Sequence, residues 1–351
     1  MDKTVRGFLD KIDLKYKTVA IALSGGADSI ATAYALNLFR RDYGYALTAL
    51  HVNHHLRGAS SDSDEALVRG FCEDKNIPLV VKHVNITQKP HESLEQAARN
   101  ARYKSFAEVA ATTGTDYIAT AHNADDNAET ILLNLIRGTG LKGLCGIPPV
   151  RPLWSRGNGS GSADCGGIGD VKTMLLRPIL GVTKSEVITY CNVNGIAYAT
   201  DETNADCAYT RNKLRRDVFP LLREINPAFT RAASRCSDTM RRYEAYFEAE
   251  TARARELCSI TADGGLTDGA KRTCGVYDAT LAGRLDRLIL ERLVSGIIYD
   301  AFVSPQERHI TEIADKIIQG VEFKLNITKN VFFISKKGEI YVKYIKQQYR
   351  S

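Results

Sequence analysis

The chain contains 351 residues, well above the roughly 150 residues of a typical domain, so two or three domains are expected. Hydrophobic residues make up 44% of the chain and charged residues 25%, which is typical of a folded globular protein and excludes wholesale disorder. No segment approaches the ~18 consecutive apolar residues of a membrane-spanning helix, and the N-terminal residues lack the apolar core of a signal peptide. We therefore expect a cytoplasmic protein with no membrane partner.

The net charge of +6 is unevenly distributed along the chain. Residues 209–242 contain nine lysines and arginines against three acids, so this stretch alone carries a charge equal to that of the whole chain. Such a concentration suits a polyanion, although a solvated helix face would have the same composition. The eight cysteines form no C-x-x-C pair, so they predict neither a zinc ribbon nor a dithiol redox site. Reduced thiols packed as small hydrophobic residues are expected.

The first half of the chain alternates strand and helix patterns. Strands are expected at 18–23, 46–52, 79–86 and 116–121, and helices at 30–39, 62–75, 92–113 and 125–137. This spacing indicates an α/β fold with a doubly wound, mostly parallel sheet. Ligands of such sheets bind beyond the carboxyl ends of the strands. Polar clusters at 24–29 and 122–129 directly follow two of the predicted strands, so we expect them to converge on one site.

The second half is predicted to be mainly helical. A Gly/Ser/Asn/Asp-rich segment at 155–171 indicates a flexible loop, and 174–180 follows as a strand or turn. Helices are expected at 184–194, 234–257, 278–295 and 305–319, and the strands 329–335 and 339–344 are expected to form a C-terminal β-hairpin. We therefore predict a catalytic domain at 1–210 and a helical, substrate-binding domain with a terminal hairpin at 211–351.

The cluster Ser24–Ser29 is the first candidate for a binding site. Glycines let the backbone approach a phosphate closely, and the following helix N-terminus offers unpaired N–H groups. No lysine follows in the frame of a Walker A loop, and Asp28 suits a Mg²⁺ ion that bridges phosphates. A plain strand-to-helix turn capped by Asp28 or Ser29 remains the alternative.

This hexapeptide resembles the PP-loop of the ATP pyrophosphatase superfamily, whose members cleave ATP between the α- and β-phosphates. The resemblance implies that the loop binds ATP through six consecutive residues: Ser24, Gly25, Gly26, Ala27, Asp28 and Ser29. Members of the superfamily adenylate a carbonyl oxygen and let a nucleophile displace AMP. The adenylate is a good leaving group, so one difficult substitution becomes two easier steps.

Four further blocks, in order, resemble the tRNA(Ile)-lysidine synthetase family. His51–Gly58 with Ser60–Asp64 resembles its H-V-x-H-x-L-R-G…S-D segment, and Glu92–Tyr103 its E-x-x-A-R-x-x-R-Y helix. Thr120–Thr130 is similar to its A-H-x-x-D-D-Q-A-E-T block, with Asn127 where glutamine is usual. Asp201–Asp206, Arg211–Arg215 and Pro220–Leu222 match its D-x-[ST]-N-x-D…R-N-x-x-R…P-L-L signature.

The resemblance implies ATP-dependent ligation of free L-lysine to C2 of the wobble cytidine of the tRNA(Ile) whose anticodon is CAU. ATP would adenylate the C2 carbonyl oxygen, and the lysine ε-amine would displace AMP to give lysidine. The expected substrates and partners are ATP with Mg²⁺, free lysine and this tRNA. The oligomeric state, a homodimer included, stays open.

Three acids at the start of the predicted 125–137 helix are candidates for lysine binding. Asp125 and Glu129 share a helix face, and carboxylates at a helix start also complement its dipole. A lysine nucleophile must lose a proton whose ordinary pKa is ~10.4, and a nearby carboxylate is able to accept it. Spacing and resemblance favour Asp126 and Glu129 for lysine.

Basic and imidazole side chains complete the predicted site. Arg99, with Arg102 as the second choice, is expected to compensate phosphate charge as pyrophosphate leaves, an ion-paired helix face being the alternative. His51, His54 and His55 do not have the spacing of a zinc site, and His122 either contacts a substrate or is structural. The residues predicted to contact tRNA are Arg211, Asn212, Lys213, Arg215 and Arg216.

Three alternatives remain at the level of sequence. Another PP-loop enzyme, either a tRNA thiolase or an amide-forming ligase, would use the same ATP chemistry. The motif-bound cysteines usual in thiolases are missing, and an amide ligase would not need the basic stretch. A non-catalytic tRNA-binding protein with a vestigial nucleotide site is the third, and ATP turnover separates it from the enzymes.

Overall fold

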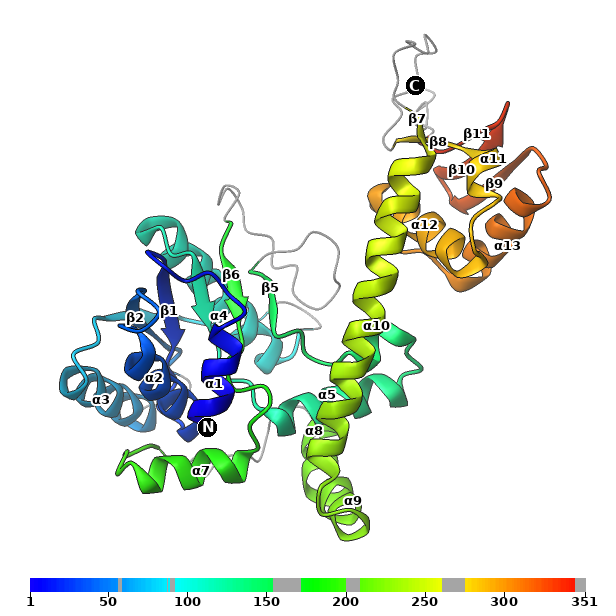
Figure 1. Ribbon diagram of the computed structural model, residues 1–351. Helices are drawn as coiled ribbons and strands as arrows, with labels where there is room; N and C mark the ends of the chain where they lie inside the picture. The colour runs from blue at the N-terminus through cyan, green and yellow to red at the C-terminus, as the bar shows by residue number, and fades with distance from the viewer. Residues whose placement is uncertain are drawn as a thin grey trace. The chain divides into compact units, whose positions relative to one another are not determined.

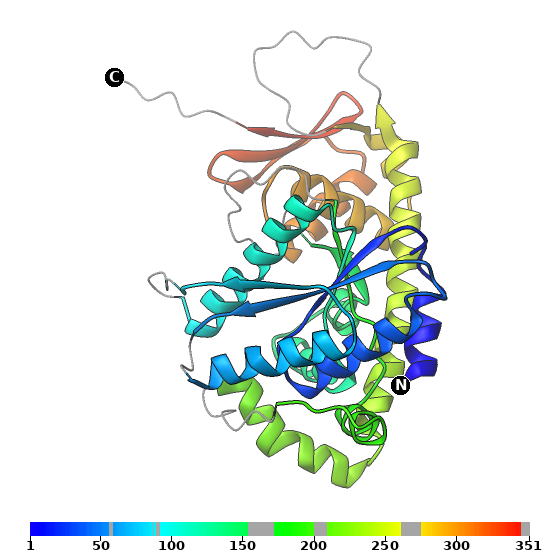
Figure 2. The same cartoon turned by 90° about the vertical axis from the view of Figure 1, so that its left-hand side faces the viewer.

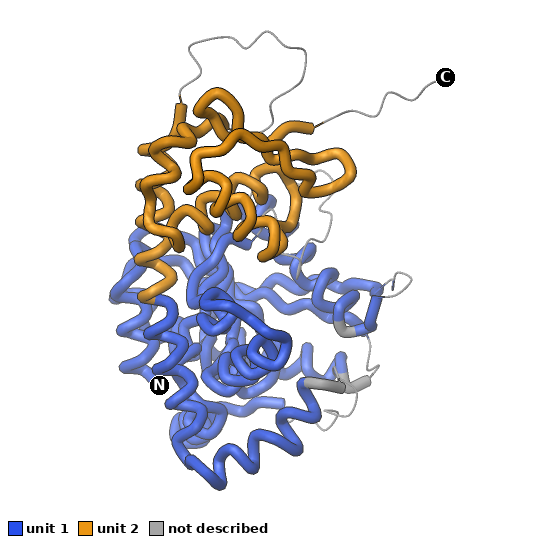
Figure 3. The backbone as a smooth tube through the Cα atoms, turned by 90° about the vertical axis from the view of Figure 1, so that its right-hand side faces the viewer, with its two compact units in different colours: residues 1–241 blue, residues 242–351 orange. Residues whose placement is uncertain are grey.

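The computed structural model describes residues 1–55, 59–86, 88, 92–153, 172–199, 209–260 and 275–344. The chain forms two compact units, residues 1–241 and 242–351 (Figure 3). The predicted division into domains at 1–210 and 211–351 stays a prediction. The segment 155–171 that we expect to be a flexible loop lies outside the described residues. No helix in the described part of the chain is long and apolar enough to cross a membrane.

The first unit is built on a sheet whose described strands run in the order β3-β2-β1-β4-β6-β5 (Figure 1). These strands are β1 (Thr18–Ala22), β2 (Ala46–Asn53), β3 (Leu79–His83), β4 (Tyr117–Ala119), β5 (Val150–Pro152) and β6 (Met174–Leu176). All neighbours pair in parallel except β5, which is antiparallel to β6. The prediction of a doubly wound, mostly parallel α/β sheet is therefore confirmed.

Alternating residues of the strands send their side chains to two different cores. Val19 and Ile21 of β1 pack in a core shared with α1 (Asp2–Leu9), α2 (Ala27–Phe39), α3 (Ala59–Asp74) and α7 (Lys184–Val193). Ala20, between them, packs with α4 (Leu94–Thr113), which crosses the opposite face (Figure 2). Because the sheet is covered on both faces, its carboxyl edge is where a ligand finds access.

The first unit contains further helical segments. They are α5 (Ala124–Ile136), α6 (Leu141–Leu144), α8 (Tyr209–Lys213), the π-helical segment η1 (Leu214–Val218), α9 (Phe219–Ile225) and the start of α10 (Phe229–Cys258). Ala128 and Leu133 of α5 form a small core with Leu214 and Phe219. This core attaches the basic stretch of the chain to the helix that carries the predicted lysine-binding acids.

The second unit combines helices with a second, antiparallel sheet. Its described strands run in the order β7-β8-β11-β10-β9, and its helices after α10 are α11 (Ala279–Ala282), α12 (Arg287–Asp300) and α13 (Glu307–Ile318). The strands are β7 (Ser259–Ile260), β8 (Val276–Asp278), β9 (Phe323–Thr328), β10 (Val331–Lys336) and β11 (Glu339–Tyr344). β10 and β11 form the predicted C-terminal hairpin, with Lys337 and Gly338 at positive φ in its turn.

The second unit also departs from the sequence-based expectation, because the unpredicted strands β7, β8 and β9 extend the hairpin into a larger sheet and one predicted helix is divided. A single helix was expected at 278–295, but the structure has two, because α11 ends at Ala282 and α12 begins after Asp286. Asp278 accepts hydrogen bonds from the N–H groups of Thr280 and Leu281, and Asp286 accepts one from that of Leu288. Each aspartate is an N-cap, so the stretch contains two helix starts.

Candidate functional site

The predicted phosphate loop lies between β1 and α2, at the carboxyl edge of the sheet. The Ser29 hydroxyl oxygen accepts the N–H of Ser24 at 3.1 Å and donates to the Gly26 carbonyl at 2.9 Å. It also lies 3.1 Å from the Ser24 hydroxyl oxygen. Gly26 is the N-cap of α2, and no side chain caps this helix. The first N–H groups of α2 therefore stay available to an anion, which favours a phosphate loop over a capped turn.

The backbone of this loop requires glycine at position 25 but not at position 26. Gly25 has φ of +92°, a backbone conformation that side-chain-bearing residues rarely adopt, whereas Gly26 has φ of −70°. We expect Gly25→Ala to lower the free energy of unfolding by about 1–2 kcal/mol. Gly26→Ala is the matched control, because a Cβ there approaches only Ser24 Oγ, at 3.7 Å. Chemical denaturation measures the free energy of unfolding of both variants. Equal losses would contradict a specific need for glycine at position 25.

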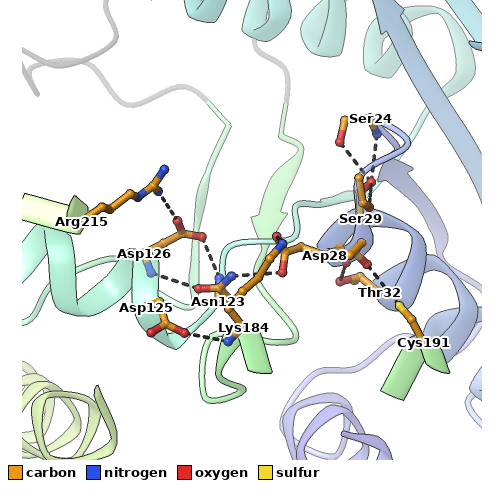
Figure 4. Close-up of polar contacts among 12 residues, drawn as sticks. Ser24, Asp28, Ser29, Thr32, Asn123, Asp125, Asp126, Lys184, Cys191 and Arg215 are labelled. Carbon is orange, nitrogen blue, oxygen red and sulfur yellow. Dashed lines mark hydrogen bonds and ion pairs between the residues drawn. The ribbon is translucent and has the colours of Figure 1, made fainter. Parts of the chain in front are cut away.

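A network of polar contacts connects the phosphate loop to the start of α5 (Figure 4). Asn123, the N-cap of α5, donates from Nδ2 to Asp28 Oδ1 at 3.1 Å. Its Oδ1 accepts the N–H of Asp126, and Asp126 Oδ2 accepts the N–H of Asn123, both at 3.0 Å. This reciprocal capping box fixes Asp126 relative to Asp28. The two polar clusters that the sequence places after separate strands therefore meet at Asn123.

Lys184, the first residue of α7, makes a second connection between the same two elements. Its Nζ lies 2.6 Å from Asp28 Oδ2, and its backbone N–H donates to Asp125 Oδ2 at 2.7 Å. Asp125 also accepts from Arg223 at 2.6 Å and from the Thr230 hydroxyl at 3.1 Å. Asp125 thus attaches α7, α9 and α10 to α5, which gives this acid a structural role.

Asp126 and Glu129, the acids predicted to bind lysine, both contact Arg215. Arg215 Nη2 lies 3.2 Å from Asp126 Oδ1, and its Nε donates to Glu129 Oε1. The Glu129 side chain is only 5% exposed, and its second oxygen is buried without a hydrogen-bond partner among the described residues. Burial, together with the neighbouring Glu129 and Asp28 charges, raises the pKa of Asp126 to about 6, although the Asn123 N–H and Arg215 oppose this. The pair therefore binds one cation, the Arg215 guanidinium group, and leaves one buried oxygen without a hydrogen-bond partner among the described residues.

Arg215 reaches these acids from an irregular part of the helical stretch. It belongs to the π-helical segment η1, which is followed by Pro220 in the first turn of α9. Proline has no N–H to donate to the carbonyl of Arg216 four residues earlier, so a regular α-helix cannot continue unchanged through this point. Local π geometry of this kind is frequent at functional sites.

The other residues predicted to contact tRNA are arranged differently around α5. Arg211 donates to the Thr130 hydroxyl of α5 at 3.4 Å. Lys213 is exposed, and Arg216, whose side chain is 83% exposed, pairs with Asp217 at 2.7 Å. The stretch therefore turns Arg215 toward the acids while it presents Lys213 and Arg216 to solvent.

The predicted basic and imidazole residues contact different parts of the first unit. Arg99 donates to the Tyr103 hydroxyl at 3.3 Å. His51 is buried, with Nδ1 2.8 Å from the Leu23 carbonyl oxygen. Burial and the charges of Arg102 and His51 lower the pKa of His54 to about 4.

His122 is held neutral by its surroundings. Its Nδ1 lies 3.0 Å from the Thr120 hydroxyl oxygen. Burial first, and then a group of nearby arginine charges, lower its pKa well below the ordinary value of 6.5; those arginines are Arg177, Arg99, Arg102 and Arg211. His122 is therefore suited to hydrogen bonding rather than to carrying a charge.

Asn127, which stands where the resembling family usually has glutamine, supports the chain after α6. Its Oδ1 accepts the N–H of Ile147 at 2.8 Å. A Cβ on Gly146, which has φ of +63°, would lie only 2.3 Å from that oxygen. The short amide therefore fits against a glycine turn and takes no part in the acidic pair.

Asp28 suits a Mg²⁺ ion by the chemistry of its oxygens. Its Oδ2 already binds a cation, the Lys184 ammonium group. The described residues contain no cluster of three or more His, Cys, Asp or Glu side chains able to hold a metal. Mg²⁺ at nucleotide sites is commonly bound by one or two carboxylates together with substrate phosphates, so a single aspartate is compatible with this ion.

Sequence reasoning missed Asn123 and Lys184 as members of the site. Both could have been found from the sequence, because each lies at a helix start that follows a strand of the sheet. Asn123 precedes the acids at 125 and 126, and Thr183 with Glu186 forms the second capping box of this edge. Arg177, one residue beyond β6, was also missed.

The chain is similar in sequence to known proteins. A family model described as a PP-loop domain matches residues 1–222. The curated tRNA(Ile)-lysidine synthase of Porphyromonas gingivalis is 38% identical over 238 residues, which are 67% of this chain and 47% of that protein. The protein of the same name from Clostridioides difficile is 31% identical over 329 residues, 92% of this chain and 65% of that protein. The chain thus spans about half to two thirds of the length of these relatives.

A solved structure is similar in fold alone. The U34-tRNA thiolase NcsA from Methanococcus maripaludis, described with its [4Fe-4S] cluster, superimposes with a TM-score of 0.54 at 22% identity. The match covers 68% of this chain and 76% of that chain. The fold and its strand-to-helix loop define an α/β protein of the nucleotide-binding type. Since the family model covers more than half of the chain, the chain belongs to the PP-loop domain family.

Proposed function

We propose that the protein ligates free L-lysine to C2 of the wobble cytidine of tRNA(Ile) with a CAU anticodon, at the expense of ATP. One observation carries the proposal: Asn123 hydrogen-bonds Asp28 of the phosphate loop and Asp126 of the acidic pair. A site for ATP and a site for an organic cation are thus joined through one side chain. The similarity to tRNA(Ile)-lysidine synthases supports lysine as that cation.

The phosphate loop would perform the first half of the reaction. The uncapped N-terminus of α2 binds the phosphates of ATP, and Asp28 orients them together with Lys184. Mg²⁺ bound at Asp28 would neutralise phosphate charge. The C2 carbonyl oxygen of cytidine attacks the α-phosphorus, so an O–P bond forms, the bond to the β-phosphate oxygen breaks and pyrophosphate leaves. Arg99 is proposed to compensate the charge of the leaving group.

The acidic pair would perform the second half. Asp126 and Glu129 bind a cation, as their contact with Arg215 illustrates, and a lysine ammonium group is the substrate we assign to them. Transfer of a proton to a carboxylate frees the amine, which forms the C2–N bond while the C2–O bond to AMP breaks. Both carboxylates sit on the first two turns of α5, so the nucleophile is held at a fixed place beside the phosphate loop.

The basic stretch would hold the tRNA. Lys213 and Arg216 face solvent close in sequence to Arg215, and phosphate contacts by such residues would orient the RNA. The wobble base must leave its stack to reach the adenylating site. Because ATP, free lysine and tRNA are all cytoplasmic, we place the reaction there.

The raised pKa of Asp126 predicts a pH dependence of lysine binding. A carboxyl group with a pKa of about 6 is ionised above pH 6 and becomes neutral below it. The affinity for labelled lysine, measured by equilibrium dialysis, should fall about tenfold between pH 7 and pH 5. Asp126→Asn removes the titrating group, so its weaker binding should show no inflection near pH 6. A wild-type affinity that is constant over this range would contradict the assignment.

Transfer of labelled lysine to an isoleucine tRNA transcript with a CAU anticodon tests the proposed function directly. Label in the RNA is expected only with ATP and Mg²⁺ present. A transcript with the anticodon mutated at its wobble base is the matched control and should remain unlabelled. ATP cleavage without lysine transfer to the competent tRNA would leave the adenylation proposal standing and exclude lysine as the nucleophile.

A further inference from the structure

Three arginines from three parts of the chain, α4, β5 and the residue after β6, gather around one buried tyrosine on the α4 side of the sheet. The guanidinium carbons of Arg99 and Arg151 lie 5.0 Å and 5.5 Å from the centre of the Tyr103 ring. The charge of Arg177 acts on the same phenol. Burial by itself would raise the pKa of Tyr103, but the three charges lower it below its ordinary value. We call Arg99, Arg151 and Arg177 the arginine cluster.

Arg177 is the member whose position most requires an explanation. It is 3% exposed, and its Nε is buried without a hydrogen-bond partner among the described residues. One terminal nitrogen donates to the Pro148 carbonyl, which is a neutral acceptor. Burial lowers the pKa of Arg177 to about 10; the charges of Arg151 and Arg99 add to this and Tyr103 opposes it, so Arg177 is still charged at neutral pH. The groups that face this buried charge are a carbonyl and the Tyr103 phenol, and no carboxylate among the described residues pairs with it, so the position favours an anion.

The acids of the chain do not supply that anion within the described residues. The hydrogen bonds of the arginine cluster go to the Tyr103 hydroxyl, which all three arginines contact, and to the carbonyl groups of Pro152 and Pro148. The three guanidinium groups therefore add their charges at one place instead of cancelling them. Planar guanidinium groups match the oxygens of phosphate, and three of them suit a group that carries more than one negative charge.

The arginine cluster lies at the same edge of the sheet as the phosphate loop. The loop follows β1, His122 follows β4 and Arg177 follows β6, and these strands are neighbours in the order β1-β4-β6. Adjacent strands are ~4.8 Å apart, so the ends of β1 and β6 are separated by about 10 Å. The neutral His122 lies between them, with the charges of Arg177 and Arg99 acting on it. A substrate held at the loop is thus within reach of the arginine cluster.

We infer that the arginine cluster is a second phosphate-binding site, built by Arg151 and Arg177 together with Arg99. Its ligand is a phosphate group, either of the pyrophosphate that ATP releases or of the RNA backbone beside the wobble base. The inference rests on the proposed function only in naming these two sources. The positive charge of the arginine cluster and the burial of Arg177 do not depend on the proposed function.

Two binding titrations test the inference without any turnover. The probes are inorganic pyrophosphate and an RNA hairpin of the tRNA(Ile) anticodon arm, each followed by calorimetry with the full chain. We expect Arg177→Met to weaken one of them at least tenfold, and the probe that is affected identifies the source of the phosphate. Arg40→Met is the matched control; Arg40 lies at the opposite end of α2, where it donates to the Asn76 carbonyl, and both affinities should be unchanged.

A stability measurement separates a binding role from a structural one. If Arg177 serves to bind an anion, Arg177→Met should unfold at the same temperature as the wild type or higher when no anion is present. Pyrophosphate or RNA should then stabilise the variant less than the wild type. Arg151→Met, at a half-buried position, carries the test if the first variant does not fold. Unchanged affinity for both probes in these variants would overturn the inference. Lysine transfer by the wild type would be unaffected by that outcome, so the two proposals fail separately.

Discussion

Replacing Asp28 with asparagine is expected to lower ATP-dependent lysine transfer at least a thousandfold. The aspartate accepts the Asn123 amide and the Lys184 ammonium group, so its charge holds the phosphate loop and α7 together at the candidate ATP site. An uncharged amide neither retains Lys184 nor suits Mg²⁺. The measurement is the rate of labelled pyrophosphate release from ATP with saturating tRNA. The loss should appear in this first half of the reaction.

The control for this variant is Asp42→Asn. Asp42 lies just beyond the other end of α2 and pairs with Arg6 at 3.2 Å, with both side chains more than half exposed. Its replacement should leave pyrophosphate release unchanged. Release at the wild-type rate by the Asp28 variant would show that the loop does not act on ATP through this carboxylate.

Glu129→Gln is expected to separate the two halves of the reaction. The change keeps the shape of a side chain that is only 5% exposed and removes the charge that faces Arg215. Binding of the lysine ammonium group should weaken, and lysine transfer should fall about a hundredfold. Pyrophosphate release with tRNA should stay within a few-fold of the wild type, because Glu129 is not part of the contacts made by Asp28. Transfer and release are measured on the same samples.

Glu108→Gln is the matched control for the second prediction. Glu108 lies on α4 and pairs with Lys82 at 4.0 Å, where both side chains are about 40% exposed, and surface pairs of this kind contribute little. Glu108→Gln should change neither lysine transfer nor pyrophosphate release. An equal loss of release and transfer in the Glu129 variant would argue that the acid supports the whole site rather than lysine alone.

Arg215 contacts the two acids that we propose as the lysine site, so this arginine can occupy the site before lysine binds. The guanidinium group supplies the positive charge that Asp126 and Glu129 need in a half-buried place. The same residue belongs to the stretch that we propose to bind tRNA. RNA bound to Lys213 and Arg216 would therefore act on the segment that carries the internal cation, and this arrangement would couple RNA binding to the lysine site.

Much of the α/β unit is determined by local sequence pattern. The strand β1 is a short, mainly apolar run with a buried centre, and α4 and α5 begin at the N-caps Ser93 and Asn123. The short strands β5 and β6 have three residues each and take their form from pairing with each other and with β4. The helix α1 was not predicted; its Val5 and Leu9 are fixed by burial against distant elements.

The sequence by itself determined the phosphate loop and the acidic cluster, because a glycine turn before a helix and acids at a helix start are local patterns. It also placed both after parallel strands and so predicted that they meet. Only the tertiary structure decided which atoms join them. Lys184 reaches Asp28 across 156 positions of the chain, and Arg215 reaches Glu129 across 86. Contacts over such separations depend on sheet order and helix packing, and Arg177 is buried beside Tyr103 for the same reason.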